Sequence, residues 1–120
     1  MNTLKTHCDL DVWKLSMDLV IDLYRITESF PNSEKFGLVM QIRRAAVSIC
    51  SNIAEGAARA HNREFAQFLY ISLGSVAEIE TQLEISMRLG YLKSKDKQQE
   101  ILDRIRRMLV GLIKNVTRNA

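Results

Sequence analysis

The chain has 120 residues, of which 47% are hydrophobic and 26% are charged, and its net charge is +3. This length suits one domain with a single sizeable core, and five glycines and one proline leave little room for many strands and turns, so we expect an all-α fold. No apolar run approaches the roughly 18 residues of a membrane span, and the N-terminal residues lack the apolar core of a signal peptide, so we expect a cytoplasmic protein with no membrane partner.

The first predicted helix covers residues 11–29. Its apolar side chains recur at helical spacing and would form a buried stripe: Val12, Leu15, Leu19, Ile26 and Phe30. Asp9 and Asp11 suit the positive end of the helix dipole at its start. Pro31 is expected to stop the helix, because a proline disfavours helical geometry in the residue before it.

The second predicted helix covers residues 34–59, with Ser33 as its N-cap. It carries the buried stripe Leu38, Ile42, Ala45, Ile49 and Ile53, and a second, polar set at the same spacing: Gln41, Arg44, Ser48, Ser51, Asn52 and Glu55. A polar stripe of this kind either faces solvent or matches the surface of a partner, and the pattern leaves both interpretations open.

The third and fourth predicted helices cover residues 63–89 and 95–117, with Asn62 and Ser94 as caps. Gly90 lies where a left-handed residue often ends a helix, and Tyr91 and Leu92 are expected to fold back over the last turn. Because the connections are short, successive helices should be antiparallel neighbours. The prediction for residues 1–120 is therefore a single domain, an up-down-up-down four-helix bundle.

The fourth helix separates apolar from cationic side chains. Arg104, Arg107, Lys114 and Arg118 fall within a narrow arc around Gly111, opposite the apolar face. Residues 93–120 carry eight Lys or Arg against three Asp or Glu, whereas residues 1–32 carry three against five. The cationic row is either a solvated face or a surface for nucleic-acid phosphates. No aromatic residues interleave with it, so any binding should be salt-sensitive and driven by backbone charge.

Catalytic and metal-binding motifs are missing from the sequence. His7, Cys8, Cys50 and His61 have no recognised ligand spacing, so two cysteines and two histidines predict no metal site. Glu78, Glu80 and Glu84 resemble part of a carboxylate metal site, but without the accompanying histidines we expect them to pair with Arg or Lys of a neighbouring helix. We therefore expect a non-enzymatic protein without a cofactor.

Four sequence blocks resemble the family of four-helix bundles encoded in 23S rRNA intervening sequences, which is related to the accessory variability determinant (Avd) proteins of diversity-generating retroelements. The blocks are DLDVWKLSMDL at 9–19, FPNSEKFGLVMQIRRAAVSICSNIAEG at 30–56, EFAQFLYISLGSVAEIETQL at 64–83 and LGYL at 89–92. One departure is Cys50, where the family usually has proline; a proline would kink the second helix.

The resemblance implies a ring-like homopentamer. It also implies that motif residues form subunit contacts or a channel-facing surface: Gln41, Arg43, Arg44, Asn52, Glu55 and Arg59. In the Avd branch a basic surface is implicated in binding nucleic acid and a reverse transcriptase. Arg44 and Arg59 are further candidate nucleic-acid contacts of this chain. For most members of the family no activity is established.

Two hypotheses about function follow. In the first, an oligomeric helical bundle binds RNA, DNA or a nucleoprotein partner through its basic faces. In the second, the protein is a structural or protein-interaction module, in which Arg43, Arg44 and Glu55 form ion pairs between subunits and the fourth helix only keeps the bundle soluble.

Overall fold

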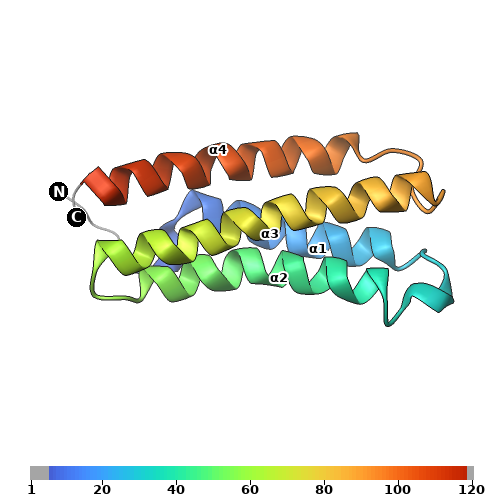
Figure 1. Ribbon diagram of the computed structural model, residues 1–120, viewed down its shortest axis with the longest axis horizontal. Coiled ribbons are helices and arrows are strands. Elements are labelled where there is room, and N and C mark those ends of the chain that lie inside the picture. Colours follow the sequence, from blue (N-terminus) through green and yellow to red (C-terminus); the bar gives the residue numbers. More distant parts are fainter. Residues whose placement is uncertain (1–5, 119–120) are drawn as a thin grey trace.

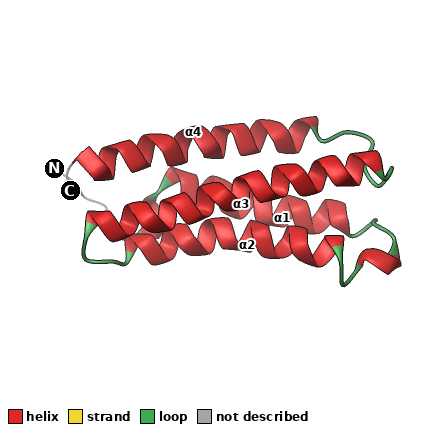
Figure 2. Cartoon of the chain, in the orientation of Figure 1, coloured by secondary structure: helices red, strands yellow, loops and turns green. Residues whose placement is uncertain are grey.

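The computed structural model describes residues 6–118 and is a bundle of four long helices, with no strand in that range. The helices are α1 (Asp11–Thr27), α2 (Leu38–Ala57), α3 (Asn62–Arg88) and α4 (Asp96–Arg118), and two short 3₁₀ turns, His7–Asp9 and Asn32–Glu34, precede α1 and α2 (Figures 1 and 2). The helices lie side by side along the long axis of the molecule. The predicted all-α four-helix bundle is confirmed.

Each helix packs against the next one in sequence, and α1 also packs against α4, which closes the bundle. The apolar face of each helix points to the centre, as the spacing predicts. The largest fully buried side chains come from all four helices: Leu19, Leu23, Ile42, Ile49, Ile53, Leu69, Val76, Ile79, Leu83, Leu102, Ile105 and Leu109. Leu15, Ile26 and Leu38 of the predicted stripes lie half-buried at the edge of this core.

The packing of α2 against α3 depends on small residues. The hydroxyl of Ser72 donates a hydrogen bond to the main-chain oxygen of Ile49 (2.8 Å), and Ser75 Oγ donates to Ser48 Oγ (2.9 Å). Nearer the turn, Gly56 packs so closely on α3 that a Cβ atom built there would lie 2.7 Å from Cβ of Phe68. Bulkier side chains at these positions would hold the two helix backbones apart.

Polar contacts connect α1 to α4 and α3 to α4. Asp22 of α1 is buried and accepts a hydrogen bond from Gln98 of α4 (2.9 Å). It also forms an ion pair with Lys97 of α4 (3.4 Å). Glu80 of α3 pairs with Arg106 of α4. The expected pairing of α3 carboxylates with basic residues of a neighbouring helix is confirmed for Glu80. Glu84 pairs instead with Lys95 in the loop before α4 (3.8 Å) and with Arg88 of its own helix (3.0 Å). For Glu78 the prediction is wrong, because this residue forms no ion pair within residues 6–118.

The start of α2 differs from the prediction. The helix begins at Leu38 rather than at residue 34, and Ser33 lies in the preceding 3₁₀ turn. The backbone of Gly37 is not helical (φ −112°, ψ −107°), and Oε1 of Glu34 accepts a hydrogen bond from the Leu38 N–H (3.2 Å). The first free N–H group is therefore satisfied by a glutamate four residues earlier, and not by the predicted serine cap.

Other helix ends differ by one or two residues. The first helix ends at Thr27, where the prediction gave 29, and Thr27 Oγ1 donates to the main-chain oxygen of Leu23 (2.7 Å). Asn62 is the first residue of α3 and makes no side-chain capping bond, so that predicted cap is wrong. Ser94 Oγ accepts from the Asp96 N–H (3.2 Å), as expected, and Gly90 has the predicted left-handed conformation (φ 80°).

Candidate interaction surfaces

The cationic row of α4 faces solvent. Arg104, Arg107, Lys114 and Arg118 are all exposed, and within residues 6–118 none of them forms a hydrogen bond or an ion pair. Gly111 lies in the middle of the row, and nothing lies within 4 Å of the position that its Cβ would occupy. The row therefore presents four exposed cations along about 21 Å of helix, at 1.5 Å per residue.

Arg106 has a different environment from the cations of this row. Its guanidinium pairs with Glu80 and lies 3.0 Å from Asp103, so its charge is matched within the bundle. This contrast separates a structural arginine from the exposed ones on the same helix.

We expect the pKa of Asp103 to lie below the usual range of an aspartate. Gln99 donates a hydrogen bond to its carboxylate (3.1 Å), and the guanidinium of Arg106 favours the charged form in the same way (3.0 Å). A carboxyl group whose pKa is lower in the folded than in the unfolded state adds stability at neutral pH, and this stability is lost as the pH falls through the folded pKa. An NMR titration of the side-chain carboxyl carbons measures the pKa. Gln99→Ala should raise the Asp103 pKa toward its usual range, and an unchanged pKa would contradict this origin of the shift.

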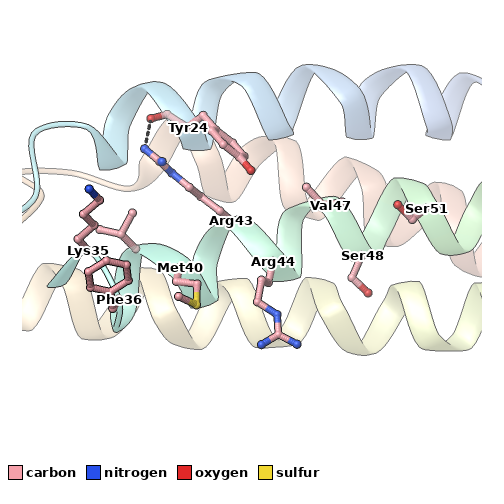
Figure 3. A pocket seen from close by; sticks show the side chains of 10 residues that line it. Tyr24, Lys35, Phe36, Met40, Arg43, Arg44, Val47, Ser48 and Ser51 are labelled. Carbon is pink, nitrogen blue, oxygen red and sulfur yellow. Dashed lines mark hydrogen bonds between the residues drawn. The ribbon is translucent and has the colours of Figure 1, made fainter.

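Arg43 binds within its own chain, at the C-terminal end of α1. Its Nε donates to Thr27 Oγ1 (3.0 Å) and its Nη2 donates to the main-chain oxygen of Tyr24 (3.1 Å), while Glu28 lies 3.1 Å from the same nitrogen. The guanidinium also lies over the ring of Tyr24, 4.4 Å from its centre (Figure 3). These contacts join α1 to α2 and occupy most of the donors of a residue proposed above for contacts between subunits.

Arg44 points the other way, toward the side on which α3 lies (Figure 3). It is exposed and forms no ion pair within the described part of the chain. Together with exposed Gln41 it lines a polar hollow of 450 Å³ between α2 and α3 that also contains Ser48 and Glu78. Of the two adjacent arginines, Arg44 is therefore the one available to a partner.

Of the remaining motif residues, Asn52 and Glu55 lie on α2 and Arg59 lies two residues after its last residue, and all three contact other residues of the chain. Arg59 pairs with Glu55 (3.0 Å) and lies 4.8 Å from the ring centre of Phe68, so a candidate nucleic-acid contact and a candidate interface residue neutralise each other. Asn52 is half-buried and donates to the main-chain oxygen (2.8 Å) and to the hydroxyl (3.0 Å) of Ser48. In the polar stripe of α2, Asn52 and Ser48 therefore make hydrogen bonds within the chain, whereas Gln41 and Arg44 are exposed to solvent.

An amphipathic groove runs along α1 and α2 and was not anticipated from the sequence (Figure 3). It has a volume of 590 Å³, and its apolar lining consists of Tyr24, Phe36, Val39, Met40 and Val47. Lys35, Arg43 and Arg44 are its charged lining residues, and no carboxylate lines it. The only signal in the sequence was a set of apolar residues outside the predicted core stripe, which by itself does not indicate exposure.

Cys50 is buried in α2, which continues as one helix through this position. Its Sγ donates to the main-chain oxygen of Val47 (3.3 Å), and burial raises the pKa of the thiol. A buried thiol with a raised pKa is a weak nucleophile, so its role here is packing.

Metal ligands do not cluster in the described residues. No group of three or more His, Cys, Asp or Glu side chains in 6–118 is arranged to hold an ion. His7 packs its ring edge-on against Trp13, with 5.1 Å between ring centres. No helix in the same range is long and apolar enough to cross a membrane.

Comparison with known proteins places this bundle among related sequences and structures. A family model described as "23S rRNA-intervening sequence protein" matches residues 8–111. The chain is also similar to the crystal structure of a protein of unknown function from the S23 ribosomal protein family of Bacteroides thetaiotaomicron. That similarity has a TM-score of 0.75 and 26% sequence identity, and it covers 86% of this chain and 95% of the other. No curated protein sequence matches the chain with significance.

Proposed function

The chain belongs to the family of 23S rRNA-intervening sequence proteins, and we propose that it is a non-enzymatic, self-associating bundle that binds the phosphate backbone of RNA or DNA through the cationic row of α4. The observation that carries the proposal is the set of four exposed cations, Arg104, Arg107, Lys114 and Arg118, none of which forms an ion pair or a hydrogen bond within residues 6–118. Family membership does not supply this function, because the solved relative has none assigned.

The chemistry of the row favours phosphate as its ligand. Guanidinium groups bind phosphate oxygens with two parallel hydrogen bonds, and neutralising phosphates releases the counterions condensed on a nucleic acid. No aromatic side chain lies in the row, so binding would follow backbone charge rather than base identity. The absence of a side chain at Gly111 leaves room for a sugar-phosphate backbone to approach the helix between Arg107 and Lys114.

The candidate contacts on α2 are secondary in this proposal. Arg59 is paired with Glu55, which reduces the charge that it can offer to a phosphate. Arg44 is exposed, but α2 lies diagonally opposite α4 in the bundle, so it cannot extend the same row. The α4 row is therefore the principal candidate surface for nucleic acid.

Fluorescence anisotropy with structured RNA and duplex DNA tests the proposal across a salt series. If all four cations contact phosphates, the logarithm of the binding constant should fall with the logarithm of salt concentration with a slope of about −3 to −4. Arg104→Glu combined with Arg107→Glu should weaken binding by about tenfold or more at low salt.

The matched control carries the same change of charge on another helix. Lys14→Glu combined with Arg25→Glu changes two exposed cations of α1, and it should bind more tightly than the α4 variant. Equal losses in the two variants would assign the binding to net charge and not to the row. No binding by the wild-type protein at low salt would overturn the nucleic-acid function.

A protein-interaction module is the second candidate function, and exposed apolar side chains favour it. Phe36, in the turn before α2, is 79% exposed, and Ile71 on α3 is 51% exposed. Large exposed apolar patches on soluble proteins commonly mark interaction sites. Solution mass from sedimentation velocity addresses self-association, and a homopentamer is the state that the family resemblance implies.

A further inference from the structure

The large exposed hydrophobic side chains of residues 6–118 fall into two separate sets, and none lies on α4. In the first set, Tyr24, Phe36, Met40 and Val47 line the groove of α1 and α2, while Met17 and Ile21 lie on α1 outside the groove lining. The second set lies on α3 and at the residue that follows its last turn, and is called the α3 ridge: Tyr70, Ile71, Ile85 and Leu89. Burying such apolar side chains against a partner is favourable, because it removes them from water. Neither set has a partner within the described chain.

The groove is concave, elongated and cationic. Its lining within α2 extends from Val39 to Ser51, which corresponds to about 18 Å of helix at 1.5 Å per residue, and Lys35 and Phe36 continue it into the turn before α2. Val39 forms a buried part of its apolar lining, and Lys35 and Arg44 contribute two positive charges that no ion pair neutralises within residues 6–118. This shape accommodates a helix that presents apolar and acidic side chains on one face.

The α3 ridge is a single convex helix face with complementary properties. Ile71 and Ile85 are separated by about 21 Å along the helix, close to the length of the groove. Gly74 and Ala77 between them are exposed and small, so another helix pair can approach the backbone closely. Glu78 lies on the same face and is exposed, and it forms no ion pair within 6–118.

We propose that the groove of α1 and α2 binds the α3 ridge of a second copy of this chain. The inference rests on the self-association in the proposed function and names the surfaces that carry it. Apolar side chains on both surfaces would become buried together, and the acidic Glu78 would enter a groove whose charged lining residues are all cations. The two surfaces differ, so the contact is head-to-tail: every copy in a pair retains one free groove and one free ridge.

The arrangement leaves the cationic row of α4 uncovered. Neither the groove nor the ridge includes a residue of α4. Association would therefore repeat the row once per copy around the assembly, and it would increase the avidity for a long nucleic acid.

Two variants test the pairing, one for each surface. The groove variant combines Phe36→Asp and Met40→Asp, and the ridge variant combines Ile71→Asp and Ile85→Asp; all four side chains are exposed, so the core is untouched. Each substitution places a charge in an apolar contact, and each variant alone should associate at least about thirtyfold more weakly than wild type. Sedimentation velocity should show monomers for both, with unchanged helix content by circular dichroism.

Mixing the two variants distinguishes a head-to-tail contact from a symmetric one. The groove variant retains an intact ridge and the ridge variant retains an intact groove, so the mixture should form a one-to-one heterodimer and nothing larger. The Arg104→Glu/Arg107→Glu variant is the matched control and should assemble as the wild type does.

Each other outcome overturns a distinct statement. A wild-type protein that is monomeric at high concentration would overturn the self-association in the proposed function. An assembled wild type whose groove or ridge variant still assembles would overturn the choice of surfaces. Monomeric variants that fail to form a heterodimer would overturn the head-to-tail pairing.

Discussion

Gly56→Ala should destabilise the bundle by about 2 kcal/mol, because overpacking at a tight helix contact typically costs about 1–3 kcal/mol. The added Cβ would lie 2.7 Å from Cβ of Phe68, 3.0 Å from Cδ1 of Phe65 and 3.2 Å from the Phe65 main-chain oxygen. Two of these neighbours are a main-chain oxygen and a Cβ atom, which cannot rotate away, so α2 and α3 would have to separate. Urea denaturation monitored by circular dichroism measures the change in the free energy of unfolding.

Gly111→Ala is the matched control, and it should change the free energy of unfolding in the opposite direction. Gly111 is exposed in the middle of α4 and nothing lies within 4 Å of its Cβ position, so alanine should stabilise the protein by about 0.5–1 kcal/mol through helix propensity. If both variants are stabilised, the close approach of the two helices at Gly56 is wrong.

Arg43→Ala should destabilise the fold by about 2 kcal/mol, since hydrogen bonds that involve a charged group contribute about 1.5–3 kcal/mol. The guanidinium joins Thr27 and the Tyr24 main-chain oxygen to α2, and it covers the ring of Tyr24. The Glu28 carboxylate adds little, because its side chain is 81% exposed and surface ion pairs are weak. Thermal and urea denaturation provide the measurement.

Arg44→Ala is the neighbouring control and should change the free energy of unfolding by no more than about 0.5 kcal/mol, as is usual for exposed positions. Arg43→Lys should not restore stability, because a lysine cannot reproduce the divergent donors of the guanidinium. Equal destabilisation by Arg43→Ala and Arg44→Ala would contradict the separate roles of the two arginines.

The cationic row of α4 could be located from the sequence because the helix is strongly amphipathic. Ile105, Leu109 and Ile113 are buried on one face, and this fixes the rotation of the helix about its axis. Arg104, Arg107, Lys114 and Arg118 must then face solvent, as they do. Their exposure was predictable, whereas a function for them stays a proposal.

The start of α2 was not predictable from residue preferences. Ser33 is a better N-cap residue than Gly37 by preference, yet the chain makes a 3₁₀ turn at Asn32–Glu34 and begins α2 at Leu38. The Glu34 carboxylate also accepts a hydrogen bond from the hydroxyl of Tyr91 (2.9 Å), which lies 57 residues later in the sequence. A contact of this separation influences the loop conformation without leaving a local sequence signal.

By itself the sequence determined the number and order of the helices, the faces that form the core and the cationic face of α4, because hydrophobic periodicity is a local property of each helix. The tertiary structure decided which polar residues are free. Arg43 and Arg44 are adjacent and chemically identical, but a rotation of about 100° between them directs the first to α1 and the second to the surface. The tertiary structure also decided that Phe36, Met40 and Tyr24 border an open groove, because the exposure of an apolar side chain depends on which other helices cover it.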